Sequence, residues 1–246
     1  MKPRVAFFDF TGCEGCQLEV LNFNLEIVDL INVVNIVEFR EASSDHSDNY
    51  DIAFIEGSIT TEKEIERIQG IRNNAKILVS LGACACTAGV NALKNFYPME
   101  ENLKLVYGEN AKWYKTIPAR PVHSVVPVDF FIHGCPPIRG EVIRLVKCLL
   151  TGKKFELYHD PVCVECKLNE NICVYEKGQT CFGPVTRGGC NSICVNGGRH
   201  CWGCRALVDE PNLNAEKELL ARYNLTVNDI LGKYRIFNGT LEVAKS

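Results

Sequence analysis

The chain has 246 residues, of which 46% are hydrophobic and 23% are charged, and its formal net charge is −3. Such values are typical of a globular protein with a sizeable core, so they exclude disorder as the main description, and the lack of a basic excess argues against nucleic acid as a partner. The most apolar runs are strand-sized and fall far short of the roughly 20 residues that cross a bilayer.

Up to residue 152, short apolar runs alternate with helical periodicity. The pattern predicts strands at residues 5–10, 33–39, 52–57, 76–81 and 128–132, and helices at residues 18–31, 60–73, after 87 and at 140–150. Because repeated strand–helix alternation is typical of parallel sheets, we expect an α/β domain at residues 1–152, with helices on both faces of the sheet.

A second module follows, in which this periodicity disappears. Between residues 161 and 204, seven glycines lie among eight cysteines and few large apolar side chains. Such a segment is expected to gain folding free energy from bound metal rather than from burial alone. We place this module at residues 153–209 and a tail at 210–246, in which residues 214–239 are predicted to form one or two short surface helices.

Cysteine is the unusual component of the composition, since the chain has 14. A chain of this length does not need disulfides to compensate for a small core. Its start runs into the first strand pattern without a secretory signal, so we expect a reducing, cytoplasmic location. In that setting clustered cysteines hold metal more often than they form disulfides.

The first group of cysteines follows the ends of predicted strands and consists of Cys13, Cys16, Cys84 and Cys135. Because the carboxyl ends of parallel strands share one edge of a sheet, these thiols are expected to converge and to hold a 4Fe-4S cluster or a zinc ion. Taken separately, Cys13 and Cys16 also fit a thioredoxin-like redox pair, and Cys84 and Cys135 also fit small buried apolar residues.

The second group comprises Cys163, Cys166, Cys173, Cys181, Cys190, Cys194, Cys201 and Cys204. Eight thiols make two sets of four, and the short C-x-x-C spacings that open and close the module favour two iron–sulfur clusters, with two zinc ribbons as the alternative. The two remaining cysteines, Cys86 and Cys148, lack such placement, and we expect both in the core.

Six short motifs occur in a characteristic order. They are TGCEGC at residues 11–16, GACA at 82–85, GCPP at 134–137, PVCVEC at 161–166, CFGPVTR at 181–187 and CWGC at 201–204. In this order they resemble the small subunit of nickel–iron hydrogenases. The resemblance covers residues 4 to about 208 and is closest to the cytosolic kind, which includes sulfhydrogenase delta subunits and the small subunits of F420-reducing and F420-non-reducing hydrogenases.

The resemblance implies a flavodoxin-like domain that faces a large subunit, followed by an irregular two-cluster module. It implies one set of ligands for each of three clusters: Cys13, Cys16, Cys84 and Cys135 for the proximal cluster, Cys190, Cys194, Cys201 and Cys204 for the medial cluster, and Cys163, Cys166, Cys173 and Cys181 for the distal cluster.

Two positions differ from the membrane-bound, periplasmic members of that family. Cys163 stands where those proteins have a histidine, and Cys194 stands where they often have a proline that leaves a 3Fe-4S medial cluster. The resemblance therefore implies three 4Fe-4S clusters in this chain.

The nickel–iron centre of the family is held by two C-x-x-C motifs of the large subunit, and this sequence has no such arrangement. We therefore expect the chain to transfer electrons and to have no catalytic residue of its own. Its expected partners are the nickel–iron large subunit and a further flavin or iron–sulfur subunit. The site of the final acceptor belongs to other subunits, so this sequence does not specify whether the acceptor is NAD(P), F420, a heterodisulfide reductase or polysulfide.

Two other interpretations remain open. A cluster-bearing subunit of a quinone-reductase-like complex has the same fold, but that relative typically has adjacent cysteines in its first motif and lacks the eight-cysteine module. A zinc-stabilised interaction scaffold without redox function fits the same spacings. Colour distinguishes the scaffold, because an iron–sulfur protein is brown and a zinc protein is colourless.

Overall fold

The computed structural model describes residues 2–22, 30–223 and 227–243. A parallel sheet is formed by β1 (Arg4–Asp9), β2 (Asn35–Phe39), β3 (Ile52–Glu56), β4 (Ile77–Leu81) and β5 (Phe130–Ile132). The strand order is β2-β1-β3-β4-β5, and every neighbouring pair is parallel. This is the flavodoxin-like order, so the expected α/β fold class is confirmed.

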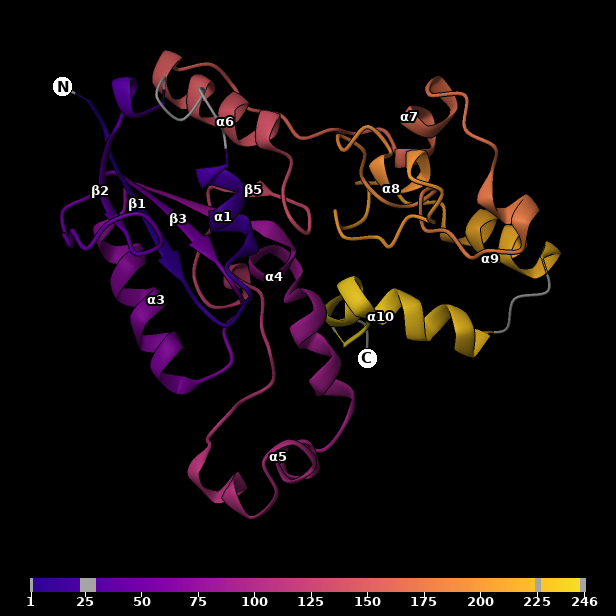
Figure 1. Cartoon of the computed structure of the whole chain (residues 1–246), viewed down its shortest axis with the longest axis horizontal. Coiled ribbons are helices and arrows are strands. Elements are labelled where there is room, and N and C mark those ends of the chain that lie inside the picture. Colours follow the sequence, from indigo (N-terminus) through magenta and orange to yellow (C-terminus); the bar gives the residue numbers. More distant parts are fainter. Residues whose placement is uncertain (1, 23–29, 224–226, 244–246) are drawn as a thin grey trace.

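Helices cover both faces of the sheet (Figure 1). Helices α1 (Gly15–Leu21) and α6 (Arg139–Thr151) contribute to the hydrophobic cluster on one face, and α3 (Glu62–Asn74) contributes to the cluster on the other. Helix α3 begins where Thr61 and Glu64 form a capping box, which explains its sharp start. Among the described residues no helix is long and apolar enough to cross a membrane.

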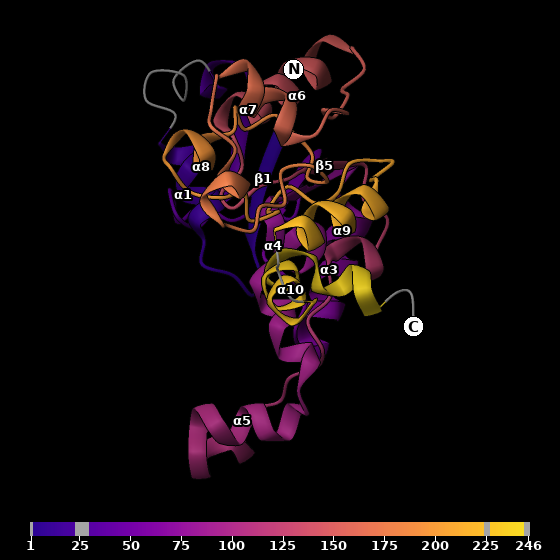
Figure 2. The same cartoon turned by 90° about the vertical axis from the view of Figure 1, so that its right-hand side faces the viewer.

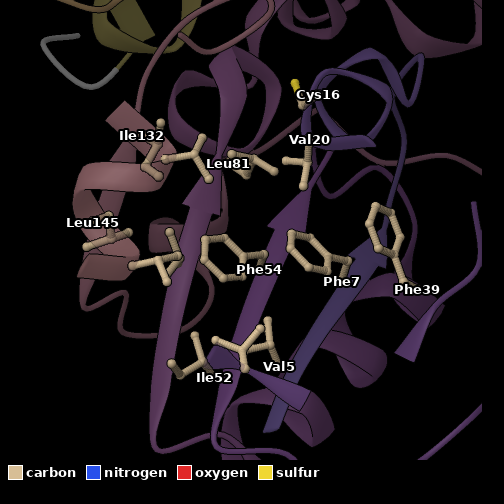
Figure 3. Packing of buried hydrophobic residues seen from close by; sticks show 14 residues of the cluster. Val5, Phe7, Cys16, Val20, Phe39, Ile52, Phe54, Leu81, Ile132 and Leu145 are labelled. Atoms are coloured by element: carbon tan, nitrogen blue, oxygen red, sulfur yellow. The ribbon is translucent and has the colours of Figure 1, made fainter. Parts of the chain in front are cut away.

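Aromatic rings form the centre of one face of the sheet (Figure 3). Phe7 stacks on Phe39 and on Phe54, with ring centroids 4.4 and 4.8 Å apart. All three side chains are at most 3% exposed. The stack joins β1, β2 and β3, and the first of these strands is the one that Cys13 and Cys16 follow.

The segment between β4 and β5 differs from the prediction. The helix expected after residue 87 is replaced by α4 (Gly82–Thr87), which ends there, and by the 3₁₀ helix η1 (Gly89–Phe96). Ala88 separates them because its φ of 59° is left-handed, which an α-helix does not accept.

Further along the same segment lie α5 (Met99–Tyr107) and the 3₁₀ helices η2 (Gly108–Trp113) and η3 (Val122–Ser124). Helix α5 projects away from the sheet in both views (Figure 2).

Two predicted boundaries near the start of the chain are wrong or untested. Helix α1 ends at Leu21, and residues 23–29 of the helix expected at 18–31 lie outside the described residues. Strand β2 begins at Asn35 rather than at residue 33, because residue 33 still belongs to a helical turn.

The cysteine-rich segment has little regular structure, as expected. It contains α7 (Val162–Leu168), the 3₁₀ helix η4 (Val174–Lys177) and α8 (Ile193–Asn196). Its small hydrophobic cluster is built around Val162, Val174, Tyr175 and Val195, together with two of the cysteines.

The tail forms α9 (Leu213–Arg222) and α10 (Val227–Val243), but α10 is more than a surface helix. Thr87 Oγ1 donates to the carbonyl of Phe237 at 2.7 Å, and Asn238 Nδ2 donates to the carbonyl of Gly203 at 3.3 Å. Helix α10 therefore contacts both the sheet domain and the cysteine-rich segment, as its position in Figure 1 shows.

Replacing Phe54 with alanine is expected to lower the free energy of unfolding by about 3–5 kcal/mol, because the change leaves a cavity in the buried ring stack. Leu105→Ala is the matched control, since Leu105 is 86% exposed on α5. We expect the control to change the free energy by less than about 0.5 kcal/mol. Denaturant unfolding followed by circular dichroism measures both, and equal losses would contradict the packing described.

Candidate functional site

Four cysteines gather at the carboxyl edge of the sheet. Cys13 and Cys16 follow β1, Cys84 lies on α4 after β4, and Cys135 follows β5. The pKa of Cys84 is raised to about 12, first by burial and then by the neighbouring thiols of Cys135 and Cys13. Burial, Glu56 and the thiols of Cys84 and Cys135 also raise the pKa of Cys16. The structure thus brings together the four residues of the first group.

A buried carboxylate lies beside this group. Glu56, at the end of β3, is 2% exposed and accepts the backbone N–H groups of Cys16 and Gln17 at 3.1 and 3.0 Å. These bonds join the first turn of α1 to the end of β3, so they fix the position of Cys16 relative to the sheet. Glu56 was not predicted from the sequence, although an acidic residue at the end of an apolar strand was an available signal.

Gly82 leaves the space that the Cys16 thiol occupies. Its φ is +85°, and a Cβ at this position would lie 2.3 Å from Cys16 Sγ. The next residue, Ala83, donates its N–H to the carbonyl of Gly134 at 2.7 Å. That bond ties the loop after β4 to the loop after β5, so the residues that carry Cys84 and Cys135 are held together by backbone.

A second set of thiols lines one cavity. The cavity has a volume of about 240 Å³ and lies between the cysteine-rich segment and the loop after β5. The cysteines that line it are Cys135, Cys190, Cys194, Cys201 and Cys204. The structure therefore brings together the four residues expected as the medial set, next to one residue of the first group.

Backbone N–H groups are directed at the sulfurs of this set. Those of Ser192 and Ile193 lie near Cys190 and lower the pKa of its thiol, and that of Gly203 does the same for Cys201, although burial raises both values more. Such bonds stabilise the anionic form of sulfur, and around iron–sulfur clusters they tune the reduction potential.

The remaining four thiols lie around α7 and η4. A Cβ on Gly183 would lie 3.2 Å from Cys163 Sγ and 3.5 Å from Cys181 Sγ, so these two sulfurs face the same point. The pKa of Cys166 is raised, first by burial and then by the thiol of Cys173. Because Cys173 is exposed, this set reaches the protein surface.

Two hydrogen bonds connect the three sets. The N–H of Cys135 donates to Cys204 Sγ, and the N–H of Cys201 donates to Cys181 Sγ at 3.3 Å. The set around Cys190 thus contacts both of the others and lies between them.

Two charged side chains flank Cys190. Glu165 Oε2 lies 3.9 Å from Cys190 Sγ. The pKa of Cys190 is raised mainly by burial; Glu165 raises it further, and the Arg205 guanidinium lowers it. Sequence reasoning did not identify either charged residue, because nothing in their spacing marks them as neighbours of Cys190.

The two cysteines outside these sets differ in exposure. Cys86 is 2% exposed, and its thiol lies 3.5 and 3.6 Å from the carbonyls of Ser80 and Ile132, so the prediction of a core position is confirmed. Cys148 is half-buried on α6. Among the described residues, no three His, Cys, Asp or Glu side chains meet closely enough to hold a single metal ion.

The donor chemistry fits thiolate ligands of iron–sulfur clusters. The expected ligands are all cysteines, and their sulfurs form three groups. A 4Fe-4S cluster takes one thiolate on each iron, so its ligands stand farther apart than those of a single ion. The pKa of Cys204 is raised to about 11, chiefly by burial, and bound iron would favour the thiolate again.

The sequence matches a family profile and is similar to several known proteins. The profile of the family described as NADH ubiquinone oxidoreductase, 20 Kd subunit, matches residues 13–149. The chain is 35% identical to sulfhydrogenase 2 subunit delta of Pyrococcus furiosus over 236 residues, which is 95% of this chain and 98% of the relative. It is 31% identical to a subunit of the F420-non-reducing hydrogenase of Methanococcus voltae over 242 residues, which is 85% of this chain and 84% of the relative.

A solved structure agrees with these sequence matches. The chain resembles a chain of an NAD⁺-reducing [NiFe]-hydrogenase in the H₂-reduced state, with 25% identity and a TM-score of 0.58. The similarity covers 63% of this chain and 95% of the other.

Replacing Gly82 with alanine is expected to reduce the iron bound by the first four cysteines, because the new Cβ would displace Cys16 Sγ and strain a left-handed backbone. Gly70→Ala is the matched control, since nothing lies within 4 Å of a Cβ there. As Gly70 lies within α3, the control is expected to keep its iron and to gain up to about 1 kcal/mol of stability. Iron and acid-labile sulfide per chain, after anaerobic purification, measure the effect. Full iron loading of Gly82→Ala would contradict the geometry described.

Proposed function

Since this chain belongs to the NADH ubiquinone oxidoreductase 20 Kd subunit family and, within it, to the small (delta) subunits of hydrogenases, we propose that it is the electron-transfer subunit of a nickel–iron hydrogenase. As part of an oxidoreductase complex, it would carry electrons between the nickel–iron site of a large subunit and a partner that reduces the acceptor. Bound 4Fe-4S clusters would supply three one-electron carriers for this transfer.

The proposed ligands follow the three groups of thiols. Cys13, Cys16, Cys84 and Cys135 would hold the proximal cluster, Cys190, Cys194, Cys201 and Cys204 the medial cluster, and Cys163, Cys166, Cys173 and Cys181 the distal cluster. The observation that supports this order is the pair of hydrogen bonds by which the middle set contacts Cys135 on one side and Cys181 on the other. Electron transfer needs carriers close to one another, and these contacts supply that proximity.

The partners and the location follow from the same proposal. The exposed thiols of Cys13 and Cys135 mark the edge of the sheet that would face the nickel–iron large subunit. The exposed Cys173 marks the surface that would face a flavin or iron–sulfur subunit. We further propose a cytoplasmic location, because clustered cysteines that bind metal are typical of a reducing compartment, and a division into residues 1–152, 153–209 and 210–246.

The test of this function uses one substitution at each end of the proposed path, in the anaerobically purified complex. Cys135→Ser is expected to stop acceptor reduction by removing a proximal ligand, while the sheet domain stays folded. Cys166→Ser is expected to impair acceptor reduction more than hydrogen–deuterium exchange at the nickel site, and to make residues 161–204 sensitive to protease. Paired assays of exchange and acceptor reduction, with limited proteolysis, measure both.

The control for that test is Cys148→Ser, because Cys148 lies on α6 and belongs to none of the three groups of thiols. It is expected to retain both activities. Acceptor reduction at the wild-type level in Cys135→Ser would show that Cys135 is not a ligand on the path. A colourless wild-type protein containing zinc would instead support the scaffold interpretation.

Cys194 offers a separate test of the ligand sets. With four thiolates at the medial site, electron paramagnetic resonance of the oxidised enzyme is expected to show no stoichiometric 3Fe-4S signal. Cys194→Pro is expected to create one and to raise the potential, because three thiolates remain around the cavity. A strong 3Fe-4S signal in the wild-type enzyme, with oxygen excluded, would contradict the assignment of Cys194.

A further inference from the structure

A fully buried arginine lies between the sheet domain and the cysteine-rich segment. The side chains of Arg205 and Glu141 are each 1% exposed, and Arg205 Nη2 lies 2.8 Å from Glu141 Oε2. Arg205 also donates to the carbonyls of Gly188 and His133, at 2.8 Å each. Its guanidinium is therefore held in one position by partners from both parts of the chain.

That position is next to Cys190. A Cβ on Gly189, the residue before Cys190, would lie 2.7 Å from Arg205 Nη2. Arg205 also directly follows Cys204, which lines the same cavity. A permanent positive charge thus lies beside the loop that carries Cys190 and at the lining of the cavity that the four thiols of the middle set share.

A carboxylate lies close to the same thiol. Glu165 accepts the N–H groups of Gly189 and Ser192 at 2.6 and 3.2 Å, so it holds the loop that carries Cys190. Glu165 itself lies on α7, between Cys163 and Cys166. The loop is therefore fixed between a cation and an anion whose positions are both set by hydrogen bonds.

The charge of Glu141 does not cancel that of Arg205 at the middle set. Its second oxygen lies 3.9 Å from Arg144 Nη2, so two arginines share one carboxylate. Arg205 lines the cavity of the middle set, and Glu141 is not among the residues that line it. Of the buried pair, the guanidinium of Arg205 is therefore the side chain that faces the cavity.

Charged side chains as close to the middle set as Arg205 and Glu165 affect the reduction potential of a cluster bound there, because the charge of the cluster changes when it takes up an electron. Reduction adds a negative charge to an iron–sulfur cluster, so a nearby cation favours the reduced form and a nearby anion favours the oxidised form. Both effects are stronger where burial excludes water.

We propose that Arg205 and Glu165 set the reduction potential of the cluster held by Cys190, Cys194, Cys201 and Cys204, the guanidinium raising it and the carboxylate lowering it. This inference rests on the proposed function, since it requires a cluster at that site. Both are positioning residues, because neither is a ligand.

The test is a redox titration of the anaerobically purified holoenzyme, followed by electron paramagnetic resonance. Arg205→Met is expected to shift the potential of one cluster downwards, and Glu165→Gln is expected to shift the same cluster upwards while keeping an amide oxygen for the loop. Arg205→Lys keeps the charge, so its potential is expected to lie closer to the wild-type value than that of Arg205→Met. A merely structural role would not produce shifts of opposite sign.

The matched control is Arg187→Met. Arg187 is also buried, at 6% exposure, and its guanidinium pairs with Asp209 at 2.6 Å and donates to the carbonyl of Tyr158. We expect all three potentials to stay unchanged in this variant.

The outcomes separate this inference from the proposed function. Opposite shifts of a single cluster in Arg205→Met and Glu165→Gln support the inference. Iron-loaded variants with unshifted potentials, or with shifts of the same sign, overturn it and leave the proposed function standing. If Arg205→Met loses iron, the titrations of the other two variants test the inference: an upward shift in Glu165→Gln with a nearly unchanged potential in Arg205→Lys supports it, and an unshifted Glu165→Gln overturns it. A wild-type protein without iron overturns the proposed function, and this inference with it.

Discussion

The relative position of the sheet domain and the cysteine-rich segment depends on the hydrogen bonds of the buried Arg205 guanidinium. This side chain comes from the cysteine-rich segment, yet two of its partners, Glu141 and the carbonyl of His133, belong to the sheet domain. Because a buried charge without its partner costs about 3–5 kcal/mol, the two parts are held in one relative position. Helix α10 reinforces that position, with Asn238 donating to Gly203 and Thr87 donating to the carbonyl of Phe237.

This relative position is what allows the sulfurs to form a continuous series. Cys135 belongs to the sheet domain and Cys204 to the cysteine-rich segment, and the hydrogen bond between them exists only when the two parts meet as described. The polypeptide by itself opposes thiolates at these places, since burial raises the pKa of the thiols. Bound iron would oppose that rise, and the N–H groups directed at the sulfurs act in the same direction. The fold and the expected clusters thus depend on each other. The fold brings the thiols together, and bound iron would favour their ionised form.

Much of the fold could be predicted, because periodicity and local signals act over a few residues. The strand at Ile52–Glu56 and the helix at Glu62–Asn74 lie within two residues of their predicted bounds. The prediction failed between β4 and β5, where Ala88 adopts a left-handed backbone that no residue preference indicated. It also treated the tail as surface helices, because the contacts of α10 are made with residues far away in the chain.

For the candidate site, the sequence by itself determined the chemistry: which residues are thiols, how their short spacings group them, and that Cys13, Cys84 and Cys135 follow strands. Those properties depend only on neighbouring residues along the chain, so the sequence alone is enough to predict them. Only the tertiary structure decided which thiol lies next to which, and it placed Glu56, Glu165 and Arg205 beside them. A charged residue acts through space, and its distance from a sulfur depends on the path of the whole chain rather than on its separation along the sequence.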